Sequence, residues 1–180
     1  MVSLQLLQNE LLRFIGAKIR SVGLWVLPFA VPLSESDVVL CLECVLPTGE
    51  VRQVQFGTMG DGQSPGVDFA TIPDGIPITE LDEKQRLWAS EWQESQSEGY
   101  ARALFVATAD TDHELARMCG EAITRIFLIR FADGSNSPTG ICVECANGSR
   151  AISYPGACGN AVTMHPSKAE WPCPVEFVDI

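Results

Sequence analysis

The chain has 180 residues, of which 46% are hydrophobic and 19% are charged, a composition typical of globular proteins and not of disordered ones. Its formal net charge of −11 would repel phosphate backbones, so we expect no binding to nucleic acid. No apolar run is long enough to cross a bilayer, and polar residues interrupt the N-terminal stretch where a signal peptide needs its apolar core. The seven cysteines, an odd number, fit a reducing compartment. We therefore expect a cytoplasmic protein that does not bind membranes.

The sequence contains the same order of segments twice. ELLRFIGAKIRSVGLWVL (residues 10–27) aligns with ELARMCGEAITRIFLIRF (residues 114–131), and LCLECVLPTGEVRQVQFG (residues 40–57) aligns with ICVECANGSRAISYPG (residues 141–156). We interpret this repetition as an internal duplication. The chain is then a single compact domain, residues 1–180, with repeat one at about 4–72, a connecting helix at about 79–99 and repeat two at about 102–180.

The apolar spacing in each repeat predicts a helix followed by antiparallel strands. In repeat one a helix is expected at about 4–15 and strands at about 18–27, 38–46 and 51–56. Repeat two is expected to begin with a strand at about 102–108 and a helix capped by Asp110 or Thr111. Its further strands are predicted at about 122–131, 140–146, 150–154 and 161–164.

Gly16 and Gly120 follow the two expected helices as C-cap candidates, and the turns PTGE and ANGS place Gly49 and Gly148 where a hairpin needs positive φ. The predicted fold class is α+β, with two similar halves, each a helix with an antiparallel sheet, joined by the central connecting helix.

Two C-x-x-C pairs, Cys41 with Cys44 and Cys142 with Cys145, would suit a four-thiolate zinc site by their spacing. Both pairs fall within predicted strands, where residues three apart point to opposite faces. A zinc knuckle needs a tight turn that directs both sulfurs to one point. We therefore expect buried thiols, no metal site and no cofactor.

No catalytic residues are assigned, and the chain is predicted not to be an enzyme. Its two histidines, His113 and His165, have no partner at a useful spacing. The alternative is a small enzyme or metal-binding protein with a site between the two halves, using Glu43, Glu144 and the cysteines. Metal analysis of the purified protein distinguishes these possibilities, because stoichiometric zinc favours the alternative.

Negative charge is concentrated between the repeats. From Asp74 to Glu114 there are ten acidic residues and three basic ones, which is a net charge of −7 out of −11. Such a surface would steer a basic protein towards it. The tryptophans of the connecting helix either pack this helix against the core or, if exposed, supply aromatic anchors. The candidate partner-binding residues are Glu80, Asp82, Glu83, Trp88, Glu91, Trp92, Glu94 and Glu98.

The segments GICVECANG, RAISYPG and NAVTM of repeat two resemble a unit of bacterial immunity proteins, including those that neutralise type VI secretion effectors. The resemblance covers about residues 114–164 and extends to residues 10–69. It implies a non-enzymatic cytoplasmic protein that binds and blocks a cognate basic toxin, for example a nuclease. An adaptor or chaperone for a secreted protein is a third possibility, because it would share the acidic face but leave its client active. The sequence leaves the oligomeric state open.

Overall fold

The structure is a computed structural model that describes residues 4–26, 38–58, 65–69, 75–81, 103–133, 138–156, 159–165, 167, 169, 171 and 174–180. The first half contains α1 (Leu4–Leu12), β1 (Lys18–Val26), β2 (Val38–Val45), β3 (Val51–Thr58) and β4 (Pro65–Asp68). It is followed by β5 (Ile76–Pro77), the 3-10 helix η2 (Ile78–Glu80) and β6 (Ala103–Ala107). The second half contains the 3-10 helix η3 (Glu114–Met118), β7 (Ile123–Phe131), β8 (Pro138–Cys145), β9 (Arg150–Gly156), β10 (Gly159–Thr163) and β11 (Val175–Asp179).

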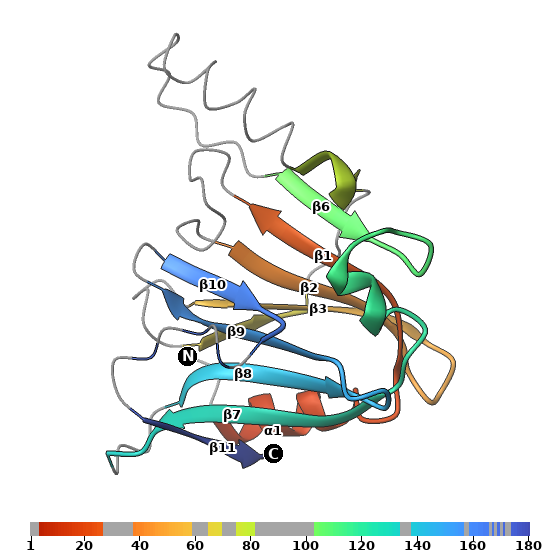
Figure 1. The fold of residues 1–180 in the computed structure, drawn as a ribbon. Helices are drawn as coiled ribbons and strands as arrows, with labels where there is room; N and C mark the ends of the chain where they lie inside the picture. Colours follow the sequence, from red (N-terminus) through yellow and green to blue (C-terminus); the bar gives the residue numbers. More distant parts are fainter. Residues whose placement is uncertain are drawn as a thin grey trace, which may run out of the picture.

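The predicted α+β class with a central helix is wrong. The structure is 59% strand and 13% helix, arranged as two sheets with one short α-helix in the described part of the chain (Figure 1). The expected connecting helix lies outside the described residues from residue 82 onwards, and its start belongs to the 3-10 turn η2. The helix expected from Asp110 is also wrong, because a loop and η3 take its place.

Local hydrogen bonding explains why no α-helix forms before η3. The Thr111 hydroxyl accepts a hydrogen bond from the Thr108 amide at 2.9 Å, and this ties the loop back on itself. The N-cap of η3 is His113, whose Nδ1 accepts from the Leu115 amide at 3.2 Å. Short polar side chains compete in this way with helical backbone hydrogen bonds.

The strands predicted between residues 18 and 163 are confirmed to within a few residues, and they build two sheets of matching order. The six-stranded sheet has the order β4-β3-β2-β1-β6-β5, and the five-stranded sheet has the order β10-β9-β8-β7-β11. The pairing of the first two strands of each half also matches, since Ile19 lies opposite Cys44 and Ile123 lies opposite Cys145. Both first strands carry an irregularity one residue after an isoleucine, Ile19 in β1 and Ile123 in β7.

The two halves meet through reciprocal backbone hydrogen bonds. The Gly16 amide donates to the Ile123 carbonyl, and the Gly120 amide donates to the Ile19 carbonyl, each at 2.7 Å. An isolated bridge between Lys18 and Ala122 lies between these two bonds. Equivalent residues thus exchange roles across the junction, which is the pattern of a local twofold axis.

Beyond this junction the sheets pack face to face, with β2, β3 and β4 against β8, β9 and β10. Leu42, Val54 and Phe56 of the first sheet share one buried core with Ile141, Val143 and Ala151 of the second. A smaller cluster covers the outer face of the second sheet, where Tyr154 lies 4.9 Å from Trp171 between ring centroids. No helix in the described residues is long and apolar enough to span a membrane.

A buried polar cluster ties the second sheet to backbone of the first. The Asn160 side chain, 1% exposed, donates to the Val38 carbonyl. Ser153, 3% exposed, donates to the Phe56 carbonyl at 3.1 Å and lies within hydrogen-bond distance of Asn160. These bonds satisfy polar groups that water cannot reach, so the cluster fixes how the sheets are stacked.

Candidate binding site

The two C-x-x-C pairs lie on β2 and β8 with their sulfurs on opposite faces, as predicted. Cys44 and Cys145 belong to the core between the sheets, whereas Cys142 belongs to the cluster on the outer face. Burial raises the pKa of Cys41, Cys44 and Cys142 to about 12, so all three carry thiols and not thiolates at neutral pH. Within the described residues no three His, Cys, Asp or Glu side chains are grouped to hold a metal ion.

Glu43 and Glu144 do not face each other, because each alternates with core residues of its strand and so lies on the outer face of its sheet. Glu43 pairs with Arg20 at 3.2 Å and accepts from the Gln53 amide group at 2.9 Å. Glu144 pairs with Arg150. The arrangement does not bring these two carboxylates together for the chemistry of a shared site.

Of the eight predicted partner-binding residues, the structure describes Glu80, which is half-buried at the end of η2. The other seven, Asp82, Glu83, Trp88, Glu91, Trp92, Glu94 and Glu98, lie outside the described residues. Further along the chain, the structure describes the loop before η3. This loop carries the last acidic residues of the span from Asp74 to Glu114.

Most ion pairs of the described residues lie on α1 and on the sheets. There the carboxylates of Glu10, Glu43, Glu50, Glu144 and Asp179 each pair with an arginine. Other exposed carboxylates without an ion pair to a described residue, such as Asp68 in β4 and Glu176 in β11, lie far apart in the sequence. In the loop before η3, by contrast, two such carboxylates, Asp110 and Asp112, lie two residues apart. This loop therefore carries two neighbouring negative charges that pair with no basic side chain in the described part of the chain.

A hollow of about 170 Å³ lies beside this loop, between η3 and the end of β10. Its apolar wall is formed by Leu24, Val38, Leu115, Val162 and Met164. Its polar lining is formed by His113, Glu114 and Thr163. A single site thus offers an apolar surface with a carboxylate beside it.

The two histidines of the chain, which are far apart in sequence, come together around Glu114. His165 Nε2 lies 3.3 Å from Glu114 Oε2, a pair that becomes an ion pair when the imidazole is protonated. His113 Nδ1 accepts from the Leu115 amide, so its proton in the neutral form is on Nε2. Sequence spacing could not reveal this grouping, because β10 and η3 meet only in the folded chain.

A second, wider hollow of about 370 Å³ lies on the other side of η3. It shares His113 and Glu114 with the first hollow and is also lined by Thr111, Asp112 and Arg117. Its lining therefore has two carboxylates, those of Asp112 and Glu114, and one guanidinium, that of Arg117. Glu114 therefore lies between two concave surfaces of negative character.

The site lies where the two halves diverge. Counted by the registers of the strands, Thr108, Asp110 and Asp112 occupy the places that Leu4, Leu6 and Gln8 hold in α1. Leu4 and Leu6 are thus replaced by Thr108 and Asp110, so this segment is less apolar than α1 and carries two carboxylates. The sequence signal for the site is this difference between the copies.

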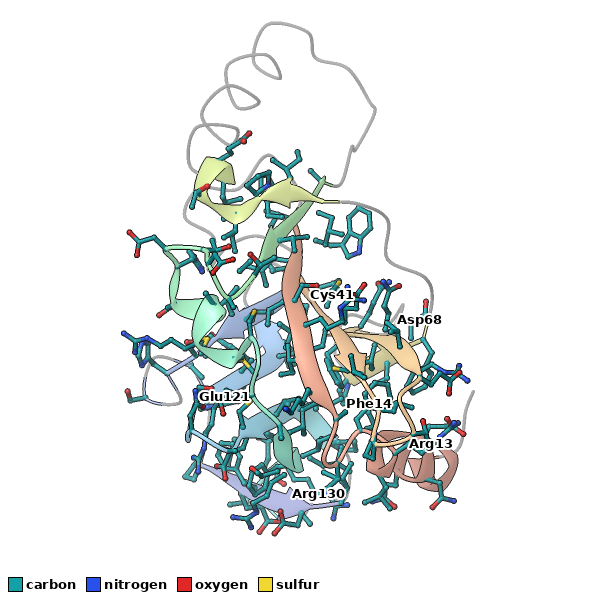
Figure 2. The ribbon with its side chains drawn as sticks, turned by 90° about the vertical axis from the view of Figure 1, so that its right-hand side faces the viewer. Arg13, Phe14, Cys41, Asp68, Glu121 and Arg130 are labelled. Carbon is teal, nitrogen blue, oxygen red and sulfur yellow. The ribbon has the colours of Figure 1, made fainter. Side chains whose placement is uncertain are left out.

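The corresponding junction in the first half is closed by aromatic rings. Phe14, which follows α1, stacks on Phe69, which follows β4, with 6.0 Å between ring centroids; Figure 2 labels Phe14 and the neighbouring Asp68. Counted across the sheets from the equivalent residues Leu40 in β2 and Ile141 in β8, Met164 takes the place of Phe69 in the second half. Methionine lacks the ring that closes the first junction, and it lines the hollow instead.

Comparison with known proteins finds no matching family model, no matching curated protein and no matching solved structure.

Proposed function

We propose that this chain is a non-enzymatic immunity protein that binds a cognate basic toxin, for example a nuclease, and blocks it. The observation that carries the proposal is the unpaired charge of Asp110 and Asp112 beside two hollows, at the end of a span with a net charge of −7. A negative electrostatic potential beside concave surfaces favours the binding of a positively charged protein surface. The predicted acidic residues of the connecting segment, from Glu80 to Glu98, would extend the same surface.

The test is protection of growth. The chain is expressed together with a basic toxin domain encoded beside its gene, and survival is compared with that of cells that make the toxin alone. We expect the wild-type chain to restore growth and the double variant Asp110→Lys/Asp112→Lys to lose most of the protection. Growth protection by the double variant at the wild-type level would contradict the proposal.

A matched control comes from β11. Glu176 is exposed and makes no ion pair with a described residue, so Glu176→Lys makes the same kind of charge change at a distant site. It should leave protection unchanged. A chain that binds the toxin but leaves it active would instead be an adaptor, so toxin activity is assayed in the purified mixture as well.

A further inference from the structure

The hollow between η3 and β10 has the size and the chemistry of a site for one amphipathic side chain. A cavity of about 150 Å³ holds a molecule the size of benzene, whereas ligand pockets for larger molecules begin at about 300 Å³. The volume of about 170 Å³ therefore suits a single long side chain. Three of the wall residues, Leu24, Val38 and Leu115, are at most 6% exposed, so the wall is a fixed part of the core.

We propose that this hollow receives an arginine side chain of the basic partner, an inference that rests on the proposed function. The alkyl part of the arginine would lie against Val162 and Met164, and its guanidinium would reach the exposed carboxylate of Glu114. Arginine suits such a place because its guanidinium is weakly hydrated and forms bidentate hydrogen bonds with carboxylates. Arg117, the basic residue of η3, lines the wider hollow on the other side of η3 and does not line this one.

His165 is the internal competitor for Glu114. Its imidazole lies on the carboxylate at 3.3 Å and would have to share it with an incoming guanidinium. Replacing His165 by asparagine removes the competing imidazole but keeps a polar side chain. His165→Asn is therefore expected to bind the cation at least as well as the wild-type chain, whereas Glu114→Gln loses the attraction.

The probe is butylguanidinium, which carries the end of an arginine side chain, and butylurea is its uncharged counterpart of similar shape. The readout is the NMR signal of the methionine methyl groups, of which the chain has four. Met164 lines the hollow and Met118 is fully buried in the core, so Met118 is an internal reference. We expect butylguanidinium to shift the Met164 signal saturably, leaving Met118 in place, and butylurea to bind about fivefold more weakly.

Three results would overturn the assignment: no shift of Met164, equal binding of butylurea, or unchanged binding in Glu114→Gln. Tighter binding of butylammonium would assign the hollow to lysine and would overturn the proposal as well. Glu114 is exposed, so Glu114→Gln should leave the thermal unfolding temperature close to the wild-type value, which is measured as a control for folding.

Met164→Phe supplies a second variant taken from the chain itself, since Phe69 holds the equivalent place in the first half. The ring should fill the hollow and abolish the response to butylguanidinium, read from the methyl groups of Leu115 and Val162. Growth protection that survives Met164→Phe would show that the hollow is not used, while the proposed function stands. If the wild-type chain binds butylguanidinium but does not protect growth, the assignment of the hollow would stand and the proposed function would be wrong.

Discussion

Gly16 and Gly120 hold the same left-handed backbone conformation, with φ of 82° and 84°, at equivalent points of the two halves. Each follows a helical segment and donates its amide to the first strand of the other half. The reciprocal pair fixes the junction about which the two sheets are arranged.

Gly120→Ala should destabilise the fold through backbone strain alone. A methyl group at this position would contact no other atom within 4 Å, but a left-handed φ costs an alanine about 1–2 kcal/mol. We expect the free energy of unfolding in urea to fall by this amount. Gly120→Asn should lose less, because asparagine tolerates the left-handed region better. Equal stability of the alanine variant and the wild-type chain would contradict the conformational argument.

Asn160→Ala should weaken the packing of the two sheets. It removes the donor to the Val38 carbonyl and a partner of Ser153 in a region closed to water. An unsatisfied buried polar group costs about 1–3 kcal/mol, which should appear in urea unfolding. The matched control is Asn147→Ala, at an exposed turn where water replaces the lost bond to the Arg117 carbonyl and the two lost bonds from Ser149. A larger loss at Asn147 than at Asn160 would count against the buried cluster.

Stability should decline in alkaline solution because of the buried thiols. Burial raises the pKa of Cys44 to about 12, with the neighbouring Cys145 adding to the effect, whereas a cysteine in an unfolded chain titrates near 8.5. Between these values the unfolded chain has lost a proton that the folded chain keeps, so the free energy of unfolding falls as pH rises. The contribution of the Cys44 thiol to the free energy of unfolding is complete below the pKa of the unfolded chain, and it is lost as the pH rises towards 12.

Urea unfolding of the wild-type chain and of Cys44→Ala at several pH values from about 8 to about 10.5 measures this contribution. Once the unfolded thiol is ionised, the wild-type slope should be steeper by about 1.4 kcal/mol per pH unit. Parallel pH profiles would mean that Cys44 titrates in the folded chain as it does in the unfolded one.

The strands were predictable because their signals are local. Short, mainly aliphatic runs that end at the turns PTGE and ANGS predicted β2 and β8, and the glycines of these turns, Gly49 and Gly148, have φ of 85° and 80° as expected. The strand β11 was not predicted, because VEFVD is short and pairs with β7 about 50 residues away in sequence. The fold class was wrong because helices were expected in both halves and between them, whereas a loop and the 3-10 helix η3 occupy the place of the helix in the second half.

The candidate site was predictable only in part. Charge counting indicated the acidic span that ends at Glu114, but the hollow depends on contacts between η3 and β10, far apart in sequence. Both histidines were interpreted as isolated, although His165 lies on Glu114. A comparison of the two copies residue by residue could have identified the site, since Asp110 and Met164 mark the places where the second copy departs from the first.

The central claim is that acidic residues at the divergent end of the second half bind a basic protein. The most direct test is calorimetric titration with a purified basic toxin domain encoded beside the gene, in about 50 to about 500 mM NaCl, for the wild-type chain and Asp110→Lys/Asp112→Lys. The wild-type affinity should fall steeply as salt rises, while the double variant binds more weakly at low salt and responds less to it. Affinities that coincide for the two proteins, or that do not change with salt, would contradict the claim.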